Sequence, residues 1–277
     1  MINEAVILLG GMGTRLLPYT KTVSKEMLPI YDVPAIFLLV KEAYLSGIKR
    51  IIFVVTEHNK DLIKSFFSDD EYLNEFLKDK EDKLLLLKEV NEIIHNMEFI
   101  YVNQALKGTY GALYSAKDYI ENDNFIVMYG DDLIFSDEPL THKLISEFEN
   151  NGKMQVAIYE KPYSELPKAG IVKLDNDNNL IDFVRKEKEN SSCELHGRML
   201  LNKKIFEIKD RLLKHDNDEY YLPHSLLNFK GKVKGFKYYG EYFNLGEKTG
   251  YIKASIYYYL QRTNDQETIT KYLKKIL

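Results

Sequence analysis

The sequence predicts an α/β protein with a Rossmann-like, three-layer αβα fold, a mixed, mostly parallel central sheet and a small added β and helical region. Short apolar runs at 5–9, 50–56 and 124–129 are typical of strands buried on both faces. Apolar residues at helical spacing over 36–44 separate the first two runs. Strand, helix and strand at these lengths predict a right-handed βαβ unit, whose two strands are parallel.

The composition permits such a fold and excludes several functional classes. The 277 residues are 45% apolar, enough for a hydrophobic core, and the 29% of charged residues argues against disorder. The net charge of −4 predicts no attraction to nucleic acid or to anionic membranes. One cysteine, Cys193, excludes an internal disulfide framework and fits a reducing cytoplasm. With no charged-then-apolar leader and no apolar run of about 20 residues, we expect a cytoplasmic protein without a membrane partner.

The first apolar run ends in a glycine-rich turn, G-G-M-G-T-R at 10–15. Glycines directly after a strand let backbone N–H groups point inward, and such a nest of donors suits a phosphate. Arg15, Lys21 and Lys25 surround the turn, against only Glu26 of opposite sign. The turn has neither the Gly-Lys-Ser/Thr ending of a P-loop nor the GxGxxG of a dinucleotide fold. We interpret it as a polyphosphate-binding loop, and an ordinary strand-ending turn is the alternative.

Two later strands also end in polar residues. The run 124–129 is followed by Gly130-Asp131-Asp132, and two adjacent carboxylates are costly to hold together without a cation. Mg²⁺ uses few protein carboxylates and fills its octahedron with water and phosphate oxygens. A strand expected at 98–102 leads to Gln104, whose amide could pair with the edge of a base. A strand-ending turn and a solvent-facing glutamine are the respective alternatives.

The other elements follow from spacing and from turn residues. We expect Asp32-Val33-Pro34 to open the first helix, with Asp32 as its cap and Gly47 after its end. The charged stretch 58–96 is interpreted as a solvated helical excursion, and 175–179 as a hairpin turn. Further helices are predicted at 111–120, 140–148 and 251–260, and a strand at 154–159. The tyrosine-rich face of 251–260 is either a subunit contact or part of the core.

The stretch 10–29, G-G-M-G-T-R-L-L-P-Y-T-K-T-V-S-K-E-M-L-P, resembles the nucleotide-binding loop of the sugar-1-phosphate nucleotidylyltransferase family, and most closely its uridylyl branch. L-H-G-R at 195–198, D-E-Y-Y-L at 218–222 and N-L-G-E-K-T-G-Y at 244–251 resemble further family motifs. The resemblance implies transfer of a uridylyl group from UTP to glucose 1-phosphate by Mg²⁺-assisted in-line attack, giving UDP-glucose and pyrophosphate. It also implies a homodimer or homotetramer. One nucleotidyltransferase domain is expected over 1–277, with a nucleotide-binding part (about 1–135), a sugar-phosphate part (about 136–250) and C-terminal helices (about 251–277).

The resemblance also assigns roles, residue by residue. The implied catalytic residues are Arg15, Lys25 and Asp131. The implied nucleotide-binding residues are Gly10, Gly11, Gly13, Thr14, Gln104, Gly108 and Thr109. Gly170, Lys186 and Glu219 are expected to bind the sugar phosphate, and Asp131 to bind Mg²⁺ together with Asn244 as a weaker ligand.

This sequence departs from the family pattern at several of these positions. Arg185 stands where the family has a glutamate that accepts hydrogen bonds from sugar hydroxyls, which a guanidinium cannot do. Asn244 replaces an aspartate, so it can still coordinate Mg²⁺ but adds no negative charge. Gly111 sits at the family's second glycine position, but Thr109 occupies the first and Gly108 lies one residue early. Two alternatives therefore stay open: an enzyme for dTTP or for another sugar 1-phosphate, and a non-catalytic nucleotide-binding relative. Assays of pyrophosphate release over a substrate panel distinguish them.

Overall fold

The computed structural model describes residues 1–162, 164, 170–184, 193–212, 218–263 and 265–276. The strands are β1 (Glu4–Leu8), β2 (Pro29–Ile30), β3 (Val33–Pro34), β4 (Arg50–Val55), β5 (Glu98–Asn103), β6 (Asn124–Tyr129), β7 (Asp132–Phe135), β8 (Met154–Glu160), β9 (Ile171–Leu174), β10 (Leu180–Val184), β11 (Cys193–Asn202), β12 (Val233–Lys237) and β13 (Glu241–Asn244). The α-helices are α1 (Ala35–Leu45), α2 (Lys60–Phe66), α3 (Glu71–Leu77), α4 (Glu81–Asn96), α5 (Gly108–Ser115), α6 (Leu140–Asn151), α7 (Leu222–Leu226), α8 (Lys248–Arg262) and α9 (Gln266–Ile276).

The central sheet is mixed and mostly parallel, as predicted. Its main path has the order β10-β9-β11-β6-β1-β4-β5, and β8 and β12 branch from β11. β1 pairs in parallel with both β4 and β6, and β4 pairs in parallel with β5. β11 is antiparallel to β6, β8 and β9, and β10 is antiparallel to β9. β10 and β11 therefore run against all the other strands of this sheet.

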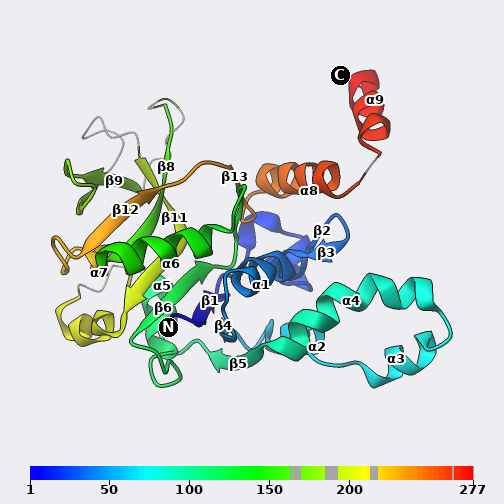
Figure 1. The fold of residues 1–277 in the computed structure, drawn as a ribbon, viewed down its shortest axis with the longest axis horizontal. Coiled ribbons are helices and arrows are strands. Elements are labelled where there is room, and N and C mark those ends of the chain that lie inside the picture. The colour runs from blue at the N-terminus through cyan, green and yellow to red at the C-terminus, as the bar shows by residue number, and fades with distance from the viewer. Residues whose placement is uncertain (163, 165–169, 185–192, 213–217, 264, 277) are drawn as a thin grey trace.

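Helices cover both faces of the sheet (Figure 1), and a hydrophobic cluster lies on each face. Successive side chains of a strand point to opposite faces, and in β1 all five residues are buried. Ala5 and Ile7 pack with the buried residues of α1, α6 and α8, whereas Val6 and Leu8 pack with those of α5 and α7. The continuous apolar run of β1 is thus explained by burial on both faces, and the three-layer αβα arrangement is confirmed.

The first helix begins later than predicted. Val33-Pro34 forms β3, which pairs with β2, and α1 begins at Ala35 with Pro34 as its N-cap and without a side-chain cap. The expectation that Asp32 caps the helix was wrong because this short strand pair precedes the helix. The Ala35 N–H donates to the Leu28 carbonyl at 3.1 Å, which ties the start of α1 to the loop that carries Lys25.

Two helical segments extend from the body in Figure 1: the α2–α4 excursion and the C-terminal α9. The excursion is helical as predicted, and the Asp70 carboxylate caps α3 by accepting from the Leu73 N–H. The predicted turn at 175–179 joins β9 to β10, and the Asp175 carboxylate accepts from the Asn179 N–H. None of the helices within the described ranges is both long enough and apolar enough to span a membrane.

Candidate active site

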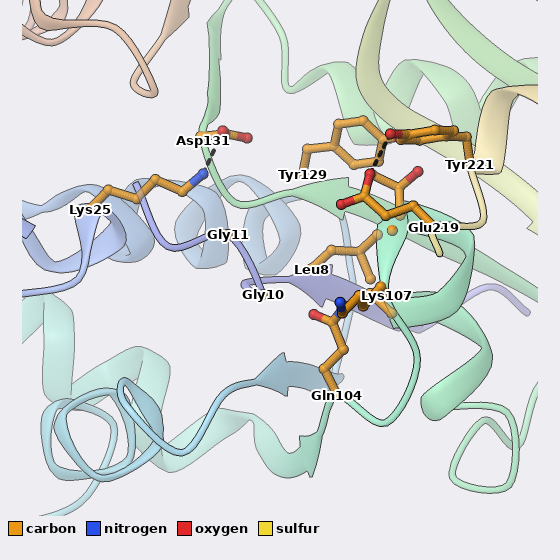
Figure 2. A pocket seen from close by; sticks show the side chains of 13 residues that line it. Leu8, Gly10, Gly11, Lys25, Gln104, Lys107, Tyr129, Asp131, Glu219 and Tyr221 are labelled. Carbon is orange, nitrogen blue, oxygen red and sulfur yellow. Dashed lines mark hydrogen bonds and ion pairs between the residues drawn. The ribbon is translucent and has the colours of Figure 1, made fainter. Parts of the chain in front are cut away.

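A cavity of about 340 Å³ opens beside the carboxyl ends of β1, β5 and β6 (Figure 2). In mostly parallel α/β sheets this edge is where ligands bind. The cavity brings together residues from segments that lie far apart in the chain. Its lining residues are Leu8, Gly10, Gly11, Lys25, Gln104, Lys107, Gly108, Thr109, Ala112, Tyr129, Asp131, Glu219 and Tyr221.

The glycines after β1 make room for two of these side chains. A Cβ on Gly10 would lie 1.5 Å from Gln104 Oε1, and a Cβ on Gly11 would lie 2.9 Å from Lys25 Nζ. Gly13 has a φ of 62°, a left-handed conformation that favours glycine, and it precedes the 3₁₀ turn Thr14–Leu16. The turn thus lets Gln104 and Lys25 approach the backbone from either side.

A buried asparagine fixes the start of this turn. Asn59, which is 2% exposed, donates from Nδ2 to the Leu9 carbonyl at 2.8 Å. Its Oδ1 accepts from the Thr56 N–H at 2.8 Å, directly after β4. Asn59 therefore links the ends of β1 and β4, and its position in a polar stretch of the sequence gave no sign of this role.

Lys25 and Asp131 form the closest charge pair of the cavity. Lys25 Nζ lies 2.5 Å from Asp131 Oδ2 and 3.9 Å from Glu26 Oε1. Burial by itself would lower the pKa of Lys25, but the carboxylates of Asp131 and Glu26 raise that pKa above its usual value. Lys25 is therefore held as an ammonium ion at the cavity wall.

Arg15, Asp131 and Asn244 meet around Gly246. A Cβ on Gly246 would lie 2.9 Å from Asn244 Oδ1, 3.1 Å from Arg15 Nη2 and 3.2 Å from Asp131 Oδ2. Asn244 Oδ1 also accepts from the Gly246 N–H at 2.8 Å, and Arg15 Nη1 lies 3.2 Å from Glu247 Oε1. The three polar side chains are thus gathered at one point, although Arg15 itself is largely exposed.

Asp132 is buried behind Asp131. It accepts from the Tyr242 hydroxyl at 2.9 Å and from the Gly197 N–H at 2.8 Å, and burial raises its pKa. These bonds join the turn after β6 to β11 and β13. Of the two positions in the Asp131-Asp132 pair, only Asp131 faces the cavity.

Gln104 lines the cavity, and its amide oxygen is free to accept a hydrogen bond. Its Nε2 donates to the Leu106 carbonyl at 2.7 Å. Its Oε1 is buried without a hydrogen-bond partner among the described residues. A buried acceptor without a donor is costly, and a ligand N–H would satisfy it.

Gly108 and Thr109 hold the segment that carries Glu219. Gly108 has a φ of 83°, and a Cβ there would lie 2.4 Å from the Tyr220 carbonyl oxygen. The Thr109 hydroxyl accepts from the Leu222 N–H at 2.9 Å. Glu219 thereby reaches the cavity, where its carboxylate accepts from the Tyr221 hydroxyl.

The cavity does not contain every residue assigned from the sequence. Gly13, Thr14, Arg15 and Asn244 do not line it. Gly170 is exposed and also lies outside the lining, and its carbonyl accepts from the Leu195 N–H before β9. Lys186, like Arg185 and Glu187, lies outside the described residues.

Conversely, sequence reasoning missed five lining residues: the polar Lys107, Tyr129 and Tyr221 and the apolar Leu8 and Ala112. Each is a direct or near neighbour of an assigned residue, and that adjacency was the available signal. Within the described ranges, no three His, Cys, Asp or Glu side chains gather as a protein-only metal cage would require.

Comparison with known proteins identifies the family. Residues 4–230 match the model of the family described as nucleotidyl transferase. The chain belongs to the nucleotidyl transferase family. A UTP–glucose-1-phosphate uridylyltransferase 2 of Staphylococcus saprophyticus subsp. saprophyticus is 32% identical over 285 aligned residues, covering 99% of this chain and 98% of that protein.

Solved structures resemble this nucleotidyl transferase over nearly its whole length. A UDP-glucose pyrophosphorylase complexed with UDP-glucose is 30% identical, with a TM-score of 0.83, covering 95% of this chain and 100% of the other. A UTP-bound UGPase from Acinetobacter baumannii is 26% identical, with a TM-score of 0.88 and full coverage of both chains. These comparisons confirm the resemblance and the fold expected from the sequence.

Proposed function

We propose that this nucleotidyl transferase transfers the uridylyl group of UTP to glucose 1-phosphate, giving UDP-glucose and pyrophosphate. The observation that carries the proposal is the cavity that joins the glycine turn, Lys25, Gln104 and Asp131. The uridylyltransferase and UDP-glucose pyrophosphorylase relatives, which align with almost the whole chain, support it.

Gln104 is proposed to recognise the base. Uracil offers an N–H donor between two carbonyl acceptors, and the unpartnered Gln104 Oε1 is an acceptor for that N–H. The backbone of Gly10 and Gly11 lines the same cavity and would lie against the nucleotide, with Gly108 and Thr109 on the other side. Gly13 and Thr14 would act from outside the cavity by shaping the turn.

The reaction needs no protein nucleophile. An oxygen of the sugar phosphate attacks the α-phosphorus of UTP, a new P–O bond forms, and the bond to pyrophosphate breaks in line with it. Catalysis then consists of positioning and charge neutralisation. Lys25 would neutralise the α-phosphoryl group in the transition state, and Arg15 would neutralise the leaving pyrophosphate through its planar guanidinium.

Asp131 and Asn244 would hold Mg²⁺. Their side-chain oxygens lie 3.2 Å and 2.9 Å from the position that a Cβ on Gly246 would take, and Arg15 Nη2 lies 3.1 Å from the same position. One carboxylate and one amide oxygen suit Mg²⁺, which takes its other ligands from water and phosphate. When bound, the ion would supply additional positive charge to the phosphates.

The sugar phosphate is proposed to bind beyond Asp131, near Glu219. Glu219 can accept hydrogen bonds from sugar hydroxyls, and we assign Gly170 and Lys186 to the same part of the site from the family resemblance alone. We further propose that 1–277 acts as one domain with the nucleotide-binding, sugar-phosphate and C-terminal parts given above. We also propose that it forms a homodimer or homotetramer in the cytoplasm, and light scattering of the purified protein tests the assembly.

Pyrophosphate release tests the function. Purified protein, UTP, glucose 1-phosphate and Mg²⁺ should give sustained release with equimolar UDP-glucose, and removal of any one component should stop it. A panel of dTTP, CTP and several hexose 1-phosphates measures specificity. Lys64→Ala, which removes an exposed lysine on α2, is the control for Lys25→Ala. Nucleotide binding without release from any substrate pair would instead support the non-catalytic alternative.

A further inference from the structure

Glu26 is a buried carboxylate to which the mechanism above gives no task. It is 0% exposed and does not line the cavity. Neither of its carboxylate oxygens has a well-formed hydrogen bond among the described residues, and the donors that act on it are its own N–H and the Ser24 hydroxyl. Its Cγ lies 3.4 Å from where a Cβ on Gly130 would be, so its stem packs under the turn that presents Asp131.

Such a carboxylate is unfavourable for folding. A buried charge that lacks hydrogen bonds costs stability, and an uncharged residue of the same shape is usually neutral or better. Glu4 shows the contrast, because it is equally buried at the opposite end of β1 but binds Arg50 and accepts from the N–H groups of Glu121 and Asn122. A structural role thus accounts for Glu4 and does not account for Glu26.

Among the described residues the nearest cation to Glu26 is Lys25, at 3.9 Å between Nζ and Oε1. Lys25 Nζ lies between two carboxylates that differ in freedom: Asp131 faces the cavity, whereas Glu26 is enclosed. On the proposed function, Asp131 would hold Mg²⁺ when the substrates are bound. Two enclosed carboxylates of the described residues then remain near the Lys25 ammonium, and Asp132 is already bound by Tyr242 and Gly197, which leaves Glu26 for Lys25.

We propose that Glu26 is a positioning residue for Lys25: it is the enclosed counter-charge that keeps the ammonium ion charged and aimed at the α-phosphate while Asp131 is engaged elsewhere. Glu26 itself touches neither substrate. The inference rests on the proposed function, since it assumes that Lys25 neutralises the transferring phosphoryl group.

Glu26→Gln keeps the shape and removes the charge. At pH 8, with UTP and glucose 1-phosphate, we expect kcat to fall by about tenfold or more and KM for UTP to change by less than about threefold. In a Lys25→Ala background, Glu26→Gln should cause no further loss, because the residue acts through Lys25. Glu4→Gln is the matched control: it should lower the melting temperature and leave kcat unchanged, whereas Glu26→Gln should leave the melting temperature equal or higher.

Three results would overturn the proposal: an unchanged kcat in Glu26→Gln, a further loss in the Lys25→Ala background, or a fall in kcat matched by a fall in melting temperature. Failure of the proposed function is recognised separately, since the wild-type protein would then release no pyrophosphate from UTP. In that case crystals of wild-type and Glu26→Gln protein with UTP and Mg²⁺ decide the matter. If the wild type keeps the 3.9 Å contact between Lys25 Nζ and Glu26 and Nζ is displaced in Glu26→Gln, the positioning role is supported. If Nζ occupies the same place in both proteins, the positioning role is refuted.

Discussion

The stability of Glu26→Gln should depend on pH differently from that of the wild type. Burial is the main cause that raises the pKa of Glu26 from its ordinary 4.5 to about 7. Between these pH values the folded protein holds a proton on Glu26 that the unfolded chain has released. Folding stability therefore falls as the pH rises through this window and levels off above 7. A difference of about 2.5 pKa units corresponds to about 3 kcal/mol.

Glutamine carries no ionisable proton, so the stability of Glu26→Gln should not fall in this way as the pH rises. We expect nearly equal free energies of unfolding for the two proteins at pH 5, and a variant that is more stable by up to about 3 kcal/mol at pH 8. Urea unfolding followed by circular dichroism at the two pH values measures both quantities. Glu4→Gln should be destabilised at pH 8, because Glu4 is fully partnered. Two results would refute the reasoning: a Glu26→Gln variant less stable than the wild type at pH 8, or the same difference in free energy of unfolding between the two proteins at both pH values.

Four further predictions follow from the site and the core. Lys25→Ala should lower kcat by at least about a hundredfold while calorimetry gives a nearly unchanged Kd for UTP, since its charge acts mainly in the transition state; equal losses in both would mean that the lysine only binds. Gln104→Ala should reduce the preference for UTP over CTP by about tenfold in competition assays, and an unchanged ratio would contradict base recognition by Gln104. Asn244→Asp should lower the Mg²⁺ concentration for half-maximal activity several-fold, because it adds a negative charge to the ligand set; a higher requirement would argue against Asn244 as a ligand. Arg198→Ala should cost about 3–5 kcal/mol in urea unfolding, because it leaves the nearly buried Glu42 carboxylate without its cation, and Glu42→Gln in the same chain should recover part of that loss.

Much of the fold could be predicted because it depends on local patterns. The apolar runs of β1, β4 and β6 are long and unbroken, and burial on both faces of a parallel sheet requires that pattern. The start of α1 could not be predicted, because Asp32-Val33-Pro34 is a good helix opening in isolation. Pairing of β3 with β2 decided the boundary, and that pairing is a tertiary contact.

The candidate site was predictable where a functional residue lies at the end of a strand. Gln104 and Asp131 carry such a signal, whereas Lys25 was found from the glycine-rich loop and its family motif, and all three line the cavity. Their convergence depends on the strand order β6-β1-β4-β5, which spacing along the chain does not specify. Asn59 and Glu26 had no signal, since their roles arise from a carbonyl and an ammonium ion that the fold brings to them.

The ion pair between Arg15 and Glu247 joins groups 232 residues apart. Glu247 and Asn244 both follow the region 4–230 that matches the family model, and β13 pairs with β7 beside Asp131. During synthesis the glycine turn therefore leaves the ribosome long before the strand that closes its far side. A growing chain that has emerged only as far as β12 would have the glycine turn, Lys25 and Asp131 but neither Asn244 nor Glu247. Activity should therefore appear only when the segment after β12 has folded.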